Sequence, residues 1–156
     1  MGPFLTIILP PGLGVALTLA ICGFALWKGG REERLASAAF LVSIAVTLLF
    51  RDQRWPALQR GALVADSALL VTFFVMAMRT SRFWPLAAAG FQLLAVMTHV
   101  AKMIDPALQQ WAYITAGVIW TYLVLVTIAI GTWNAWRRRA HPTKAVAAGP
   151  LDATRR

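Results

Sequence analysis

Two side chains that could exchange protons lie within apolar segments of this sequence. Asp66 lies in GALVADSALLVTFF, and His99 lies in LLAVMTHVAKMI. An ionised aspartate near the centre of a membrane helix costs about 2.5–3.5 kcal/mol, so such a residue usually faces protein or a wet cavity and has a partner. His99 is the only histidine within an apolar run, and it is therefore the candidate partner of Asp66.

The spacing along the chain brings these two side chains to a similar depth. Only the residues RTSR separate the two apolar runs, so the runs should form a tight antiparallel helical hairpin. Across this turn Asp66 and His99 differ in depth by two or three residues, or about 3–4 Å of helix rise. Ser67 and Thr98 fall at the same depth. The sequence predicts a polar layer of four side chains on neighbouring helices, although spacing alone does not say which way they point.

Three interpretations of this layer remain open. In the structural one, Asp66 and His99 share a hydrogen bond that lowers the cost of burial and sets the hairpin register. In the functional one, the pair forms a protonatable site near the outer surface of a membrane. In the third, His99 lies at the level of the lipid headgroups and is hydrated, because Lys102 and Asp105 follow it closely.

The same side chains limit the ligands that the chain could bind. A quinone or another lipid-like molecule could use Asp66, His99 and the hydroxyl of Tyr113. A b-type haem normally needs two axial ligands, and the apolar runs contain one histidine, so one chain alone is not expected to bind haem. We find no cluster of metal ligands and no pairing of a nucleophile with a base. We therefore expect no resident cofactor, no metal and no enzymatic activity.

The composition is that of a membrane protein. Of the 156 residues, 59% are hydrophobic and 13% are charged, whereas a soluble domain has about 25% charged residues. Long apolar runs without the alternation of barrel strands predict an all-α, multi-pass helical bundle. The net charge of +9 is typical of a chain whose basic residues set topology and contact anionic lipids, and we expect no nucleic-acid partner. The single cysteine, Cys22, allows no intrachain disulfide.

Five membrane spans are expected, joined by short loops. They cover residues 4–27, 35–50, 58–78, 84–100 and 111–133. The second span has 16 residues, or about 24 Å, which is short for a hydrocarbon core of about 30 Å. An alternative with four spans therefore stays open.

Three dipeptides that contain proline are predicted to begin helices, since proline at the first helical position gives up a donor that would be unpaired anyway. They are Trp55-Pro56, Trp84-Pro85 and Asp105-Pro106. The segments WPALQRGA and DPALQQWA, 50 residues apart, also resemble each other. Two explanations of this similarity stay open: a duplicated hairpin, as in some transporters, and chance.

The distribution of basic residues predicts the orientation in the membrane. With five spans, eleven Lys and Arg residues fall on one side and four on the other. The positive-inside rule then places the N-terminus outside and the C-terminus in the cytoplasm. Residues 1–136 would form the bundle, and residues 137–156 a flexible basic tail. Within that tail Arg137, Arg138 and Arg139 are expected to contact lipid headgroups.

These features lead to three hypotheses for function. The first is an accessory or structural subunit, or a homo-oligomer, of the bacterial inner membrane, because short loops and five helices would leave little interior for a large cavity. Its partners would be membrane lipids and other membrane proteins or a second copy of the chain. The second is a small carrier or proton-linked transporter that uses Asp66 and His99. The third is a redox component of the membrane that binds quinone or haem.

Overall fold

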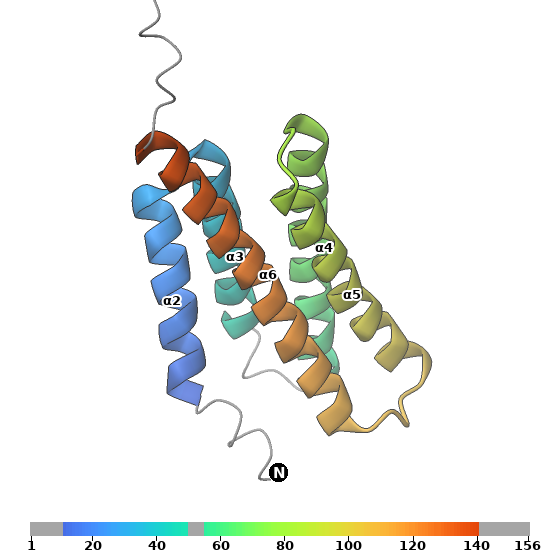
Figure 1. The fold of residues 1–156 in the computed structure, drawn as a ribbon. Helices are drawn as coiled ribbons and strands as arrows, with labels where there is room; N and C mark the ends of the chain where they lie inside the picture. The colour runs from blue at the N-terminus through green and yellow to red at the C-terminus, as the bar shows by residue number, and fades with distance from the viewer. Residues whose placement is uncertain (1–10, 50–54, 141–156) are drawn as a thin grey trace, which may run out of the picture.

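The described part of the chain consists of five α helices and the turns between them (Figure 1). The computed structural model describes residues 11–49 and 55–140, and within these ranges it contains no strand. The helices are α2 (Pro11–Lys28), α3 (Arg31–Leu49), α4 (Trp55–Arg79), α5 (Trp84–Ile104) and α6 (Gln110–Ala140). The predicted all-helical class is confirmed.

Most helix boundaries lie within a few residues of those expected from the sequence. The predicted starts at Trp55 and Trp84 are confirmed. Helix α3 begins at Arg31, four residues before the predicted span, and its acidic first turn is stabilised by the positive end of the helix dipole. Residues 4–10 of the first span and residue 50 of the second lie outside the described residues.

The basic segment after the fifth span is helical where the structure describes it. Arg137, Arg138 and Arg139 form the last turn of α6, which ends at Ala140. The predicted tail is therefore wrong for residues 137–140, and residues 141–156 lie outside the described residues. Cations are favourable at a helix C-terminus because they face unpaired carbonyl groups.

The prediction that Asp105-Pro106 begins a helix is wrong. Asp105 instead ends α5 with an extended backbone, and its carboxylate accepts a hydrogen bond from the Ala107 amide at 2.9 Å. Lys102 donates hydrogen bonds to the carbonyls of Pro106 and Leu108, which holds this segment as a turn. The suggested duplication also loses support, because one copy of the similar segment begins α4 whereas the other spans a turn.

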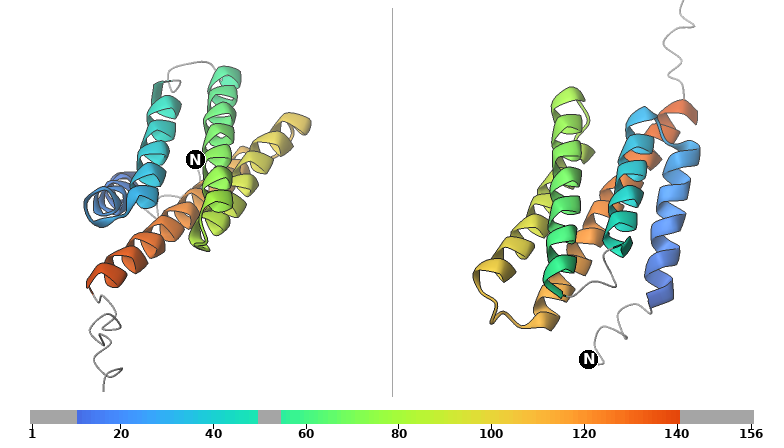
Figure 2. Two further views of the ribbon diagram at one scale, coloured as in Figure 1. Left: turned by 90° about the horizontal axis from the view of Figure 1, so that it is seen from above. Right: turned by 180° about the vertical axis from the view of Figure 1, so that it is seen from behind.

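The helices form a ring in which each packs against its neighbours. Helix α5 packs against α4 and α6, α3 packs against α2 and α4, and α2 closes the ring by packing against α6. Two further views show the α4–α5 hairpin, with α3 beside α4 and α2 beside α3 (Figure 2). The four-residue connection between α4 and α5 gives the tight hairpin that the sequence predicts.

The tightly packed core occupies the half of the bundle that contains the C-terminus of α6. Its largest fully buried apolar side chains are Phe73, Leu125, Ile128 and Val124. Trp84 at the start of α5 lies against Gly131 of α6, where a Cβ would stand 2.8 Å from three atoms of the indole ring. This contact brings α5 and α6 together at one end of the bundle.

Two turns at this end are joined by an ion cluster that the sequence analysis did not anticipate. Glu33 is fully buried, accepts a hydrogen bond from the Gly30 amide at 2.8 Å, and pairs with Arg82 of the α4–α5 turn. Arg82 also lies 3.4 Å from Glu32, which accepts a hydrogen bond from Thr80. The cluster therefore ties the start of α3 to the hairpin of α4 and α5.

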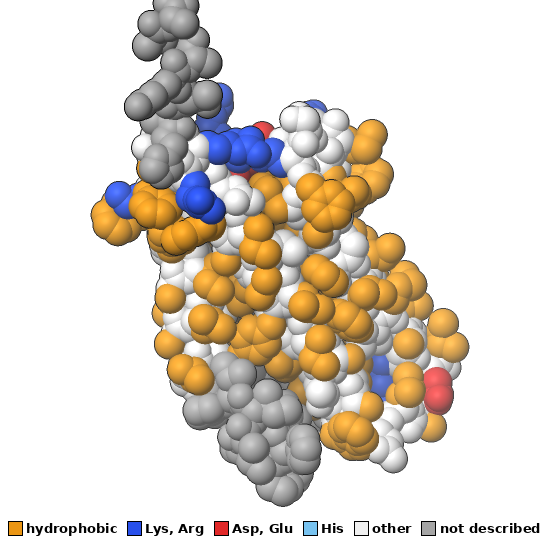
Figure 3. Space-filling model, viewed as in Figure 1, with side chains coloured by type: hydrophobic (Ala, Val, Ile, Leu, Met, Phe, Trp, Pro, Cys, Tyr) orange, Lys and Arg blue, Asp and Glu red, His pale blue; other side chains and the backbone are white. Residues whose placement is uncertain are grey.

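Within the residues that the structure describes, three helices are long and apolar enough to cross a membrane. These segments are Arg60–Arg79, Trp84–Ile104 and Gln110–Ala140, and Gly12–Lys28 is a shorter apolar helix. Apolar side chains cover much of the visible side of the bundle, and basic side chains gather at the end where α2 and α6 finish (Figure 3). This surface is compatible with a membrane protein.

Candidate functional site

Three side chains from three helices form a hydrogen-bonded chain. His99 Nε2 of α5 lies 2.9 Å from Asp66 Oδ2 of α4, and His99 Nδ1 lies 2.7 Å from the hydroxyl of Tyr113 of α6. The histidine and tyrosine rings meet edge to face, with centroids 5.5 Å apart. The hydrogen bond between Asp66 and His99, one of the outcomes left open by the hairpin spacing, is thus present.

The two partners determine which nitrogen of a neutral His99 carries the proton. An ionised carboxylate can only accept hydrogen bonds, so Nε2 donates to Asp66 and Nδ1 accepts from the Tyr113 hydroxyl. If the imidazole gains a second proton, Nδ1 donates to Tyr113 and the phenolic hydrogen becomes available to another acceptor. Protonation of His99 would therefore change the hydrogen bond that Tyr113 offers to its surroundings.

Burial makes this arrangement chemically different from a surface pair. The side chain of His99 is 12% exposed and that of Asp66 is 25% exposed. Both ring nitrogens of His99 have side-chain partners, which disfavours the interpretation of a histidine that is simply hydrated.

Of the other residues in the predicted polar layer, Thr98 takes part and Ser67 does not. Thr98 accepts a hydrogen bond from the indole of Trp120 at 3.1 Å, which links α5 to α6. Ser67 is half-buried and does not line the cavity described below. One residue along a helix turns the side chain by about 100°, so Ser67 and Asp66 face different directions.

Gln92 is a buried polar residue that the sequence analysis missed. Its side chain is only 3% exposed and donates a hydrogen bond from Nε2 to the backbone carbonyl of Asp66 at 3.3 Å. Gln92 lies about two turns from His99 on α5, so a periodicity argument applied to His99 could have placed both on one face.

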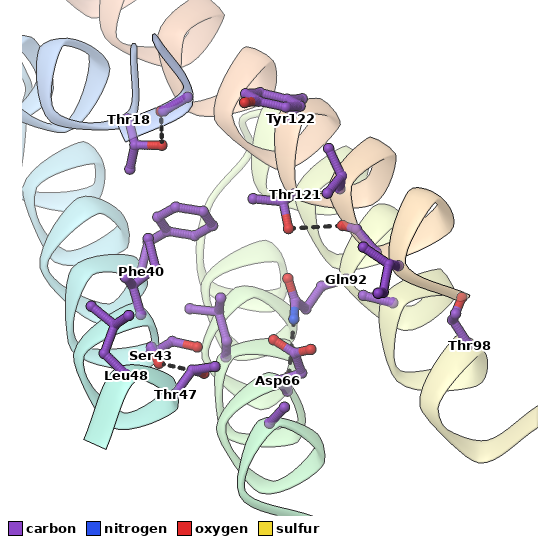
Figure 4. A pocket seen from close by; sticks show the side chains of 18 of the residues that line it. Thr18, Phe40, Ser43, Thr47, Leu48, Asp66, Gln92, Thr98, Thr121 and Tyr122 are labelled. Atoms are coloured by element: carbon purple, nitrogen blue, oxygen red, sulfur yellow. Dashed lines mark hydrogen bonds between the residues drawn. The ribbon is translucent and has the colours of Figure 1, made fainter. Parts of the chain in front are cut away.

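The Asp66–His99–Tyr113 chain lies in the wall of a cavity of about 670 Å³. All five described helices contribute to this wall, as Figure 4 shows for Thr18 of α2, Phe40 of α3, Asp66 of α4, Gln92 of α5 and Tyr122 of α6. Most of the lining is apolar, with polar groups at a few positions. Small-molecule sites in proteins typically have volumes of about 300–1,000 Å³ and this kind of lining.

The cavity occupies the half of the bundle opposite the packed core. It is bounded toward the core by Phe40, Leu69 and Gln92, each less than 5% exposed. The expectation that five helices leave little interior for a large cavity is therefore wrong. The helices converge where Trp84 meets Gly131 and where Glu33 meets Arg82, and the space between them remains open toward the other end.

The remaining predicted residues lie away from this cavity. Arg137, Arg138 and Arg139 are in the last turn of α6, at the end of the packed half. Among residues 11–49 and 55–140, no three side chains of the types that bind metals lie together. His141 lies outside the described residues.

A double-mutant cycle measures the coupling between Asp66 and His99. We expect the Asp66→Asn and His99→Gln changes in unfolding free energy, measured in detergent, to be non-additive by about 1 kcal/mol. Asp66→Asn removes the charge, and His99→Gln removes the imidazole, from the same interhelical hydrogen bond. The control is a second cycle that combines Asp66→Asn with Thr72→Val. The Thr72 hydroxyl donates a hydrogen bond within its own helix, so these two losses should be additive. Additive losses for Asp66 and His99 would contradict the direct interaction.

No family model matches the chain, and comparisons with curated proteins and with solved structures give no match. The geometry of the cavity and its polar groups is therefore what indicates a function.

Proposed function

We propose that this chain is a small multi-pass membrane protein that binds an amphiphilic small molecule within its helical bundle. The observation that carries the proposal is the hydrogen-bonded chain of Asp66, His99 and Tyr113 in the wall of a 670 Å³ cavity. An amphiphile would place its apolar body against the apolar lining and its polar head against these three side chains.

The proposed membrane topology has five spans, with the N-terminus outside and the C-terminus in the cytoplasm. Three helices meet the length and hydropathy expected of spans. Helices α2 and α3 have 18 and 19 residues, or about 27–28 Å, and both pack in the same ring as the longer helices. The described basic residues at the ends of α2, α4 and α6 lie at one end of the bundle, which supports a cytoplasmic location for that end and an inner-membrane protein.

The cavity favours ligand binding over a purely structural role. The hypothesis of an accessory subunit or homo-oligomer depended on an absence of interior space, and that reason no longer holds. Association with a larger complex stays a prediction that native gels in mild detergent would test. A carrier function would require the packed half around Phe73 and Leu125 to open as well, so binding from one side is the simpler proposal.

The test is to fill the cavity without disturbing the packing around it. Gly117 lines the cavity and Gly90 faces outward on α5, and neither has any atom within 4 Å of the position that a Cβ would take. We expect Gly117→Trp to abolish saturable binding of an amphiphile, because the indole would occupy the space, whereas Gly90→Trp should bind as the unmodified protein does.

Three probes of nearly the same shape but different charge allow this test without knowledge of the natural ligand. They are tetraphenylphosphonium, tetraphenylborate and triphenylphosphine oxide. Binding is measured by equilibrium dialysis against protein in phosphatidylcholine nanodiscs, with empty nanodiscs as the blank. If none of the three binds saturably, or if Gly117→Trp binds as well as Gly90→Trp, the proposed function is wrong.

A further inference from the structure

We infer that the cavity selects an amphiphilic organic cation, such as a protonated amine or a quaternary ammonium or phosphonium ion, with Asp66 as its counter-ion. This inference rests on the proposed function and names the class of ligand for the same site. It follows from the charges in the cavity wall, from the hydrogen-bonding capacity of the wall, and from the competition between a cation and a proton.

The charged groups in the described part of the cavity wall have one sign. Among the lining residues that the structure describes, Asp66 is the only carboxylate, and there is no Lys or Arg. The other titratable groups in this lining are His99 on α5 and Tyr113 and Tyr122 on α6, while the described parts of α2 and α3 contribute only hydroxyl and apolar side chains. An anionic head group would therefore meet a carboxylate that no basic side chain of the described lining offsets.

The basic residues nearest this part of the described structure do not enter the cavity. Lys102 donates its hydrogen bonds to the carbonyls of the turn after α5. Arg60 lies on the exposed surface of α4 and is not a lining residue. Among the described side chains, the titratable base that is hydrogen-bonded to Asp66 is His99.

The hydroxyl groups of the wall offer mainly acceptors. Four threonines use their hydroxyl hydrogens within their own helices, each donating to the carbonyl four residues earlier at 2.8–3.0 Å. Their lone pairs are what remains for a ligand. These residues are Thr18, Thr47, Thr98 and Thr121. Oxygen acceptors at these four positions suit a ligand that carries positive charge or N–H donors.

Aromatic rings add a second attraction for a cation. Phe40, Tyr113 and Tyr122 line the cavity on α3 and α6. The face of an aromatic ring attracts cations, most strongly when both groups are removed from water. A cation with an apolar body would satisfy the carboxylate, the rings and the aliphatic lining at the same time.

A bound cation and a proton on His99 would be alternative counter-charges for Asp66. When the imidazole is neutral, the Asp66–His99 pair carries one negative charge, which a ligand cation neutralises. When the imidazole is protonated, the pair is already neutral and the ligand gains less. By linkage each weakens the binding of the other, so cation binding releases a proton to the solvent.

The experiment compares the three probes at several pH values in phosphatidylcholine nanodiscs. We expect tetraphenylphosphonium to bind saturably and tetraphenylborate not to bind. The affinity for tetraphenylphosphonium should rise with pH, by up to about tenfold per unit for competition with one proton.

Two variants and a matched control test the role of each side chain. Asp66→Asn, which keeps the shape and removes the charge, should weaken tetraphenylphosphonium binding by at least about tenfold. Asp105→Asn makes the same change at the exposed turn after α5 and should leave binding unchanged. His99→Gln should bind the cation and lose most of the pH dependence, because the competing base is gone. Thermal unfolding of each variant verifies that it is folded.

The outcomes separate the class of ligand from the function itself. If tetraphenylborate or triphenylphosphine oxide binds as tightly as the phosphonium and Gly117→Trp blocks it, the cavity binds amphiphiles but the inference of a cation is wrong. If Asp66→Asn folds and binds the phosphonium as tightly as Asp105→Asn does, Asp66 is not the counter-ion. If no probe binds saturably, the proposed function itself fails.

Discussion

Replacing Arg82 with Met should lower the free energy of unfolding by about 3–5 kcal/mol, the loss typical of breaking a buried ion pair by removing one partner. Glu33 has no exposed surface, and Arg82 is the cation paired with it. Without the guanidinium, the carboxylate either remains charged in a poorly solvated environment or takes up a proton, and both outcomes cost free energy. The same change releases Glu32 and so loosens the contact between the two turns.

The measurement is reversible unfolding in mixed micelles with increasing denaturing detergent. Arg79→Met removes an exposed arginine from the end of α4, only three residues away, and should change the unfolding free energy by less than about 0.5 kcal/mol. The double variant Glu33→Met with Arg82→Met should recover much of the loss, since no buried charge remains. A double variant that is no more stable than Arg82→Met would show that the unpaired charge is not the cause.

Replacing Gly131 with Ala should destabilise the protein by about 1–3 kcal/mol, although the added group is a single methyl. That methyl would lie 2.8 Å from three atoms of the Trp84 ring, and Trp84 is only 6% exposed. A rigid, buried indole has no low-energy rotamer into which it could withdraw without disturbing its neighbours. We therefore expect α5 and α6 to separate slightly at the packed end.

The control for this prediction is Gly23→Ala, also within a helix. A Cβ at Gly23 has no atom within 4 Å, so the substitution should stabilise the protein by about 0.5–1 kcal/mol through the higher helix propensity of alanine. Unfolding curves for both variants under the same conditions provide the comparison. If Gly131→Ala is as stable as Gly23→Ala, the indole is not held against α6.

The helices and the α4–α5 hairpin could be predicted because they depend on local properties of the chain. Continuous apolar runs bounded by tryptophan, proline and basic residues gave boundaries close to those of α4 and α5. The four-residue connection favours an antiparallel hairpin for these two helices, and this hairpin brings Asp66 and His99 to a similar depth. Asp105-Pro106 was mistaken for a helix start because the stabilising partner of that turn, Lys102, lies on the preceding helix.

The candidate site could be predicted only in part. Asp66, His99 and Thr98 were identifiable as polar residues in apolar runs, and Tyr113 as a nearby hydroxyl. Ser67 was included because residue spacing gives its depth along the helix but not the direction in which its side chain points. Gln92 was missed because the helical periodicity was not extended from His99 back along the same face, although its amide joins α4 to α5.

The sequence by itself determined that the chain is helical, where its polar layer lies, and that one acidic and one basic side chain share that layer. Only the tertiary structure decided that α6 brings Tyr113 to His99, that α2 and α3 enclose a cavity beside them, and that Glu33 is buried against Arg82. The physical reason is that depth along a helix follows from residue spacing, whereas the rotation of each helix and its distance from non-adjacent helices depend on side-chain packing throughout the bundle.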